Sequence, residues 1–174
     1  MRKKSIMAGI LLVVLGIAVS YAQTQTPKAE PILTEKAVKG FIKNHSKLLK
    51  GINAFYERNN SKETQWVESF QTIVEEDFNQ VTAFLKKNPA PKKLQAVFKK
   101  YGLDGKTGVL QIMVITYTAL SSEHGDMEAP FAIHPDDIKL VQKYRTEVSE
   151  LLKPIPVETE TDSGSKKNTD TGDQ

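Results

Sequence analysis

The sequence predicts an all-α protein, a bundle of four to five helices around one central apolar helix. Apolar residues recur every three or four positions along most of residues 34–153, which is the spacing that gives a helix one buried stripe. Proline, glycine and asparagine separate these stretches, and such residues end helices. Residues 108–120 are apolar almost all round, as expected for a helix that other helices enclose.

A leader is expected before this domain, in residues 1–22. It has a cationic start, an apolar run from Ile6 to Val19 and the small residues Ser20 and Ala22, which together are typical of a signal peptide cleaved after Ala22. Cleavage after Ser20 and retention as a membrane anchor are the alternatives, although a spanning helix needs roughly 20 apolar residues. We therefore expect export to the periplasm or the exterior, and a mature chain that does not span the membrane.

The helical bundle domain is expected over residues 34–153. Residues 23–33 are polar and contain two prolines, so they are expected to form a flexible lead-in to it. Thr34 suits the N-cap of a first helix over about residues 35–58. The apolar stripe of that helix consists of Val38, Phe41, Ile42, Leu48, Leu49, Ile52, Phe55 and Tyr56.

A second helix is expected over about residues 61–87. Asn60 and Glu63 have the three-residue spacing of a capping box at its start. The sequence Asn-Pro-Ala-Pro at residues 88–91 ends it, because proline cannot continue the helical hydrogen bonds. A short third helix is expected over residues 91–101.

Two turn residues are expected to separate the third helix from the central one. Gly102 suits the left-handed position just past a helix end, and Asp104 suits the N-cap of the central helix. On that helix only Gln111, Ile115 and Thr118 share a side that could face outward. Its β-branched content leaves a strand as the alternative, but its length and its cap favour a helix.

A loop over about residues 121–137 is expected after the central helix. Pro135 and the two aspartates that follow it form a favourable first turn for a last helix over about residues 136–153. Residues 154–174 contain no large apolar side chain after Val157, so we expect a disordered tail.

Two polar residues interrupt the apolar stripes. His45 lies in the stripe of the first predicted helix and Asp77 in that of the second. If these helices are antiparallel neighbours, both residues lie at a similar distance from the turn near Asn60. Because buried polar groups need partners, we predict that His45 and Asp77 hydrogen-bond and set the register of the two helices, without a catalytic role.

Gly105, Lys106 and Thr107 resemble the end of a phosphate-binding loop. Such a loop has a glycine five residues before the Gly-Lys pair and follows a strand, whereas this position holds Lys100 and a predicted helix precedes the turn. We therefore expect no nucleotide binding. The same joint resembles a helix-turn-helix, but its apolar second helix cannot read base edges, so no nucleic-acid binding is expected.

Lysines cluster around the third predicted helix, where Asp104 is the one acidic residue among them. These lysines are Lys86, Lys87, Lys92, Lys93, Lys99, Lys100 and Lys106. Such a cationic patch can meet anionic lipid headgroups, a polysaccharide or an acidic protein, and a merely solvated face is the alternative. The positive charge is local, because the chain outside the leader has as many basic as acidic residues, 21 of each.

The sequence offers little that could support catalysis. The absence of cysteine excludes disulfides, thiolate metal ligands and cysteine nucleophiles, and no zinc-protease or serine-hydrolase motif occurs. The loop after the central helix gathers His124, Asp126, Glu128 and His134. These residue types could hold zinc or a similar ion, although their spacing matches no known site.

Together these observations predict an exported soluble protein of the bacterial cell envelope or exterior, a non-enzymatic binding or accessory protein that needs no cofactor. The cationic patch predicts an anionic envelope component or a protein as its partner. The alternative is an envelope hydrolase or a metal-binding protein that uses the acidic loop with His124 and His134.

Overall fold

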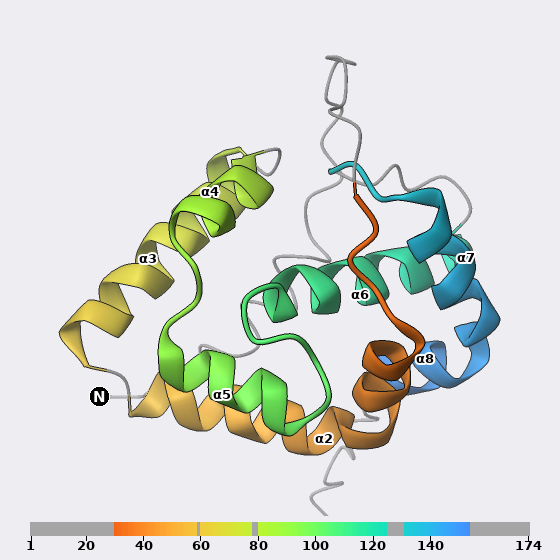
Figure 1. Ribbon diagram of the computed structural model, residues 1–174, viewed down its shortest axis with the longest axis horizontal. Helices are drawn as coiled ribbons and strands as arrows, with labels where there is room; N and C mark the ends of the chain where they lie inside the picture. The colour runs from red at the N-terminus through yellow and green to blue at the C-terminus, as the bar shows by residue number, and fades with distance from the viewer. Residues whose placement is uncertain (1–29, 59, 78–79, 125–130, 154–174) are drawn as a thin grey trace, which may run out of the picture.

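The computed structural model describes residues 30–58, 60–77, 80–124 and 131–153, with Glu123 and His124 described by their backbone alone. Within these ranges it contains seven helices and no strand, so the all-α prediction is confirmed (Figure 1). None of these helices is long and apolar enough to cross a membrane. Three predicted segments lie outside the described residues: the signal peptide of residues 1–22, lead-in residues 23–29 and the tail of residues 154–174.

Helix α2, Glu35–Glu57, is the first predicted helix, and it begins at its predicted cap. The Thr34 hydroxyl accepts the backbone N–H of Ala37 at 3.1 Å, which satisfies one of the free amides of the first turn. One face of α2 is buried against other helices, and its buried residues are Ala37, Val38, Phe41, Leu48 and Phe55.

Helix α3, Ser61–Glu76, begins with the predicted capping box. The Asn60 side chain accepts the N–H of Glu63 at 3.0 Å, and the Glu63 carboxylate accepts the N–H of Asn60 at 2.9 Å. Lys93 of α5, Lys92–Lys100, also donates to this carboxylate at 3.0 Å and so ties the two helices together. These contacts, with the Asn60 amide first, hold the pKa of Glu63 below its ordinary value.

The second predicted helix is divided, because α3 ends at Asp77 and a separate helix α4, Val81–Lys87, follows. The carbonyl of Asp77 accepts the N–H of Gln80 at 3.0 Å, as in a turn. The Gln80 side chain donates to the Asp77 carboxylate at 2.7 Å. Such side-chain bonds compete with the helical backbone bonds, which is why aspartate favours helix ends over helix interiors.

Helices α3 and α4 pack against each other as a hairpin (Figure 1). The rings of Trp66 and Phe70 stack with centroids 5.4 Å apart, and Phe84 of α4 lies beside both. The Trp66 indole N–H donates to the carbonyl of Asn88, just past α4, at 2.9 Å. The hairpin is thus closed by aromatic packing and by one hydrogen bond from the partly buried indole.

Helix α5 ends on the predicted glycine turn. Gly102 has a φ of 92°, and the N–H of Leu103 returns to the carbonyl of Phe98 at 3.0 Å, which satisfies a carbonyl of the last turn. Gly102 also touches α2. A Cβ at Gly40 would lie 3.0 Å from the carbonyl oxygen of Tyr101 and 3.1 Å from the Cα of Gly102, so glycine at position 40 permits this close approach.

The last predicted helix is divided at Tyr144 into α7, Pro135–Lys143, and α8, Arg145–Leu152. The Tyr144 hydroxyl donates to the Glu35 carboxylate at the start of α2, and Lys143 pairs with the same carboxylate at 3.2 Å. The hydroxyl contact is the largest cause of the lowered pKa of Glu35, about 2. The joint allows both α7 and α8 to pack on α2 and α6, Gly108–His124.

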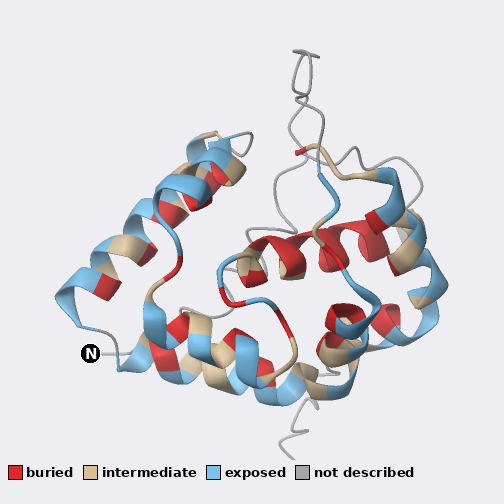
Figure 2. Cartoon of the chain, in the orientation of Figure 1, coloured by how far each residue is buried: buried red, intermediate tan, exposed pale blue. Residues whose placement is uncertain are grey.

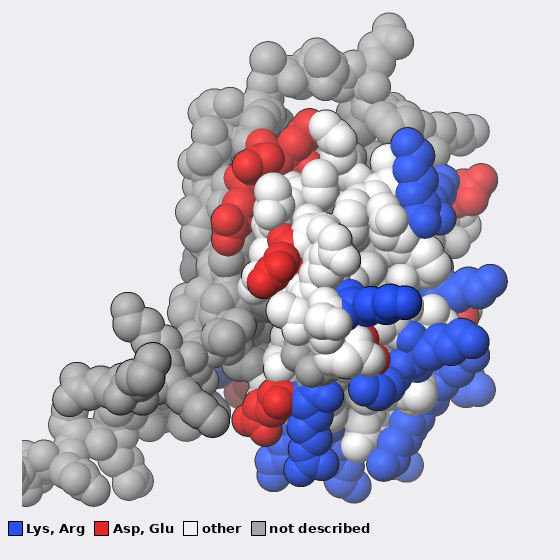
Figure 3. Space-filling view, turned by 90° about the vertical axis from the view of Figure 1, so that its left-hand side faces the viewer, with Lys and Arg blue, Asp and Glu red and all other residues white. Residues whose placement is uncertain are grey.

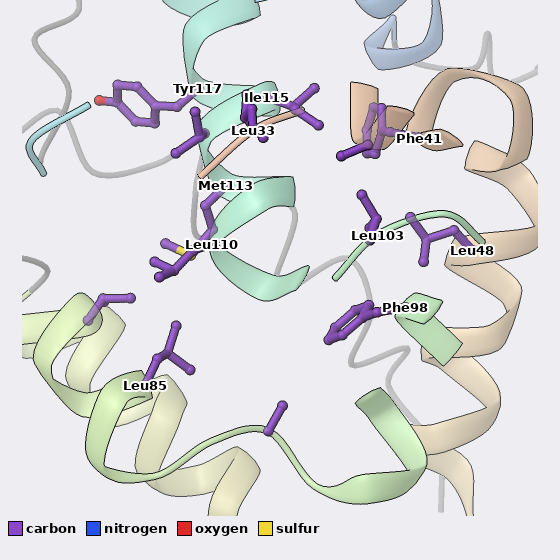
Figure 4. Packing of buried hydrophobic residues seen from close by; sticks show 14 of the residues in the cluster. Leu33, Phe41, Leu48, Leu85, Phe98, Leu103, Leu110, Met113, Ile115 and Tyr117 are labelled. Carbon is purple, nitrogen blue, oxygen red and sulfur yellow. The ribbon is translucent and has the colours of Figure 1, made fainter. Parts of the chain in front are cut away.

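Helix α6 is the apolar helix expected at the centre, and it packs against α2, α5, α7 and α8. Buried residues concentrate on it (Figure 2), and Ile115 faces Phe41 of α2 (Figure 4). The side expected to face outward is buried too, since Gln111, Ile115 and Thr118 are at most 3 % exposed. That expectation is wrong because neighbouring segments cover α6 all round. The helix also continues to His124, into the predicted loop.

The end of the predicted lead-in is docked, not flexible. Asp137 of α7 is 2 % exposed, and its carboxylate accepts the N–H groups of Ile32 at 3.0 Å and Leu33 at 2.9 Å. Gln111 of α6 donates to the carbonyl of Ile32 at 2.8 Å. The prediction is wrong for these two residues because it rested on the polar composition of the whole segment, whereas their partners belong to helices about 80 to 105 residues further along.

Candidate functional site

The predicted pair of His45 and Asp77 is not formed. His45 is half-buried, its ring lies edge-on to Phe41 with centroids 5.0 Å apart, and its Nε2 is buried without a hydrogen-bond partner in the described part of the chain. Burial lowers the pKa of His45. Asp77 ends α3 and accepts from Gln80. The prediction fails because it needed the first two helices to pack as antiparallel neighbours, whereas α2 packs against α5, α6, α7 and α8, and α3 packs against α4.

Only one of the four proposed metal ligands has a described side chain. His134 is the N-cap of α7, and its Nδ1 accepts the backbone N–H of Asp136 at 3.1 Å. The side chains of His124, Asp126 and Glu128 lie outside the described part. Among the described side chains, no group of three or more histidine, aspartate or glutamate residues could hold a metal ion. The metal site stays a prediction.

The Gly-Lys-Thr turn joins two helices and is held by an aspartate. The Asp104 carboxylate accepts the N–H groups of Lys106 and Thr107, both at 2.8 Å, and the Thr107 amide is the largest cause of the lowered pKa of Asp104. In a phosphate-binding loop such amides point at the ligand. Here α5 precedes the turn and a side chain of the protein already occupies the amides.

The seven lysines of the predicted cationic patch are all exposed. Lys86 and Lys87 end α4, four lie on α5 and Lys106 lies in the turn after it. Within the described residues one of the seven forms an ion pair, Lys93 with Glu63. Lysines in the last turns of α4 and α5 also complement the helix dipole, so part of the patch stabilises its own helices.

The structure adds a row of lysines on α2 that the sequence analysis missed. The row consists of Lys36, Lys43, Lys47 and Lys50, all exposed and without an ion pair in the described part of the chain. Their spacings of seven, four and three residues place them on one helix face. That spacing is visible in the sequence, but its meaning depends on which helix lies beside it.

This row borders α5. The residues of α2 that touch α5 include Gly40, which meets Tyr101, and Gly51, which meets Val97. Gly40 follows Lys36 by four positions, and Gly51 follows Lys47 by four. Residues four apart are neighbours on a helix surface, so each of these contacts with α5 lies beside a lysine of the row. On α5, Lys93 and Lys100 stand four before and three after Val97. We call the combined set the α2–α5 lysine surface: Lys36, Lys43, Lys47, Lys50, Lys92, Lys93, Lys99 and Lys100.

Charge is also separated on the face that Figure 3 shows, which is the left-hand side of Figure 1. Lysine and arginine side chains gather along the lower and right-hand parts of the view, and acidic side chains lie mainly at the upper left. Exposed acids of α3 include Glu68, Glu75 and Glu76. Four lysines outside this surface are paired with close acids: Lys39 and Lys143 with Glu35, Lys139 with Asp136, and Lys153 with Glu150.

The described residues therefore define an all-α protein with one predominantly lysine-covered face. Comparison with protein-family models, curated proteins and solved structures yields no significant match.

Proposed function

We propose that this chain is an exported helical-bundle protein that binds an anionic component of the cell envelope through its lysines and catalyses no reaction. The observation that supports this proposal is the α2–α5 lysine surface, on which Lys93 is the one member with an ion pair among the described residues. Uncompensated positive charge on one face attracts anions over several ångströms and orients their approach.

The alternative is an envelope hydrolase or a metal-binding protein that uses the loop with His124 and His134. Either activity needs an imidazole nitrogen that is free to bind a metal or transfer a proton. In a neutral imidazole one nitrogen accepts and the other carries the proton. The accepting nitrogen of His134, Nδ1, already takes the Asp136 amide, which leaves no lone pair for a metal or for accepting a proton and favours the binding protein over the alternative.

The proposal is tested by binding to soluble polyanions, using fluorescein-labelled dextran sulfate and poly-L-glutamate in anisotropy titrations. We expect binding at 50 mM NaCl that weakens several-fold at 300 mM, since salt screens exposed charges beyond the Debye length of about 10 Å at 0.1 M. The double variant Lys47→Gln/Lys100→Gln should bind less tightly than the wild type.

The matched control is Lys139→Gln/Lys153→Gln, which removes the same net charge from two lysines that are already paired with acids. It should bind like the wild type. Equal losses in both double variants would show that net charge, not this surface, attracts the anion. No binding of any anionic probe, including the lipid vesicles described below, would reject the proposal.

A further inference from the structure

We infer that the anionic partner is the surface of a lipid bilayer, with α2 and α5 lying flat against its headgroups. The inference rests on the proposed function and specifies its ligand. The lysines form an array in two dimensions. The row on α2 runs from Lys36 to Lys50, about 21 Å at 1.5 Å per residue, and the lysines of α5 span about 12 Å beside it.

The surface between the two rows has no groove at the described glycine contact. A Cβ at Gly40 would already be 3.0 Å from the carbonyl oxygen of Tyr101, and the Asn44 side chain donates to that carbonyl at 3.4 Å. A polymer strand or a single anion is usually held in a concave site. The backbone contact leaves no space for a ligand between the two helices there, so an anion meets the lysines from outside, as an extended planar ligand can.

The composition of the face also suits headgroups. Between Lys36 and Lys50 on α2, and along α5, the exposed residues are lysines apart from Ser46 and Ala96. Lysine is a compact, hydrated point charge on a mobile stem, whereas arginine makes fixed two-pronged contacts. A surface of lysines therefore needs no fixed ligand geometry, which fits lipids that diffuse within their layer.

The same composition predicts how the protein binds. No exposed large apolar side chain of these two helical stretches is available to insert between the lipids, so attachment is peripheral, electrostatic and reversed by salt. Each lysine near an anionic leaflet strengthens binding about fivefold. The exposed acids of α3, Glu68, Glu75 and Glu76, are repelled by the same leaflet, and this repulsion favours one orientation.

The experiment is co-sedimentation of the purified protein, as an exporting host processes it, with vesicles of 30 % phosphatidylglycerol in phosphatidylcholine. Vesicles of phosphatidylcholine alone are the lipid control. We expect binding to the anionic vesicles at 50 mM NaCl, at least tenfold weaker binding to the neutral ones, and release at 300 mM. Lys47→Gln/Lys100→Gln should lower the affinity about tenfold or more, and Lys139→Gln/Lys153→Gln less than twofold.

Folding of each variant is checked by circular dichroism and by the fluorescence of Trp66, the single tryptophan. Equal affinity for neutral and anionic vesicles, or an equal loss in both double variants, overturns the inference. Binding to dextran sulfate or poly-L-glutamate without binding to vesicles also overturns it, while the proposed anion-binding function stands. Binding to none of these ligands overturns both.

Discussion

The carboxylate of Asp137 accepts the backbone N–H of Leu33 at 2.9 Å, joining two residues that are 104 positions apart. The other oxygen of the same carboxylate accepts the N–H of Ile32. Gln111 bonds to the carbonyl of Ile32 and accepts the N–H of Asp104 at 2.8 Å. Two side chains of the helical core thus supply the backbone partners that a segment without secondary structure needs.

Replacing Asp137 by alanine should destabilise the protein by about 2–4 kcal/mol, because two backbone N–H groups would lose a charged acceptor. Asp137→Asn keeps one acceptor oxygen and should cost less. The free energy of unfolding is measured by urea titration. Asp136→Ala is the control, since this neighbour is exposed and its pair with Lys139 lies at the surface. Similar losses at both positions would contradict the buried contact.

Gly40→Ala should destabilise the protein by about 1–2 kcal/mol. Overpacking typically costs 1–3 kcal/mol, and the better helix propensity of alanine offsets up to about 1 kcal/mol of it. The new Cβ would meet the backbone of Tyr101 and Gly102, which cannot move aside alone. Gly105→Ala is the matched control, because its Cβ would meet the flexible Lys99 side chain. A Gly40→Ala protein as stable as the wild type would refute the close contact.

His45 should make stability fall as the pH is lowered. Burial lowers its pKa below the ordinary value of 6.5, so below that pH the unfolded chain binds a proton more readily than the folded chain. The free energy of unfolding is therefore not reduced by His45 above about pH 6.5. It declines as the pH falls from there toward the lower pKa that His45 has in the folded state. His45→Leu should reduce this decline between pH 7.5 and 5.5.

At pH 7.5 the free energy of unfolding of the His45→Leu protein should lie within about 1 kcal/mol of the wild-type value, because the substitution removes a buried nitrogen that lacks a hydrogen-bond partner in the described part of the chain. Thermal unfolding of both proteins at the two pH values measures the difference. An unchanged pH dependence in the variant would show that His45 does not cause the decline.

Export with cleavage after Ala22 is expected from the leader sequence alone. When the full chain is expressed in an exporting host, the mass of the purified protein should correspond to a chain that begins at Gln23. A chain that begins at Tyr21 would indicate the alternative cut after Ser20, and a chain that keeps Met1 or the apolar run would rule out cleavage. The measurement also establishes which form is used in the vesicle experiment.

Local features of this protein could be read from neighbouring residues in the chain. The Thr34 cap, the Asn60–Glu63 capping box and the Gly102 turn are all confirmed, because each depends on residues within four or five positions. The all-α class follows from the three- and four-residue spacing of apolar side chains. The lysine patch around α5 was also visible, since its members are close together in the sequence.

Tertiary structure decided the features that depend on residues far apart. The stripe pattern did not reveal that α2 and α3 pack against different helices, and so the pairing of Asp77 with His45 was wrong. Gln111 was expected to face outward because the sequence shows which residues are its neighbours on the same helix. It does not show that the distant Ile32 accepts a hydrogen bond from Gln111. The lysine row of α2 lies beside the lysines of α5 because of a tertiary contact, the close approach of Gly40 to Gly102. Sequence patterns record which way a side chain faces within its own helix, and packing alone determines what lies opposite.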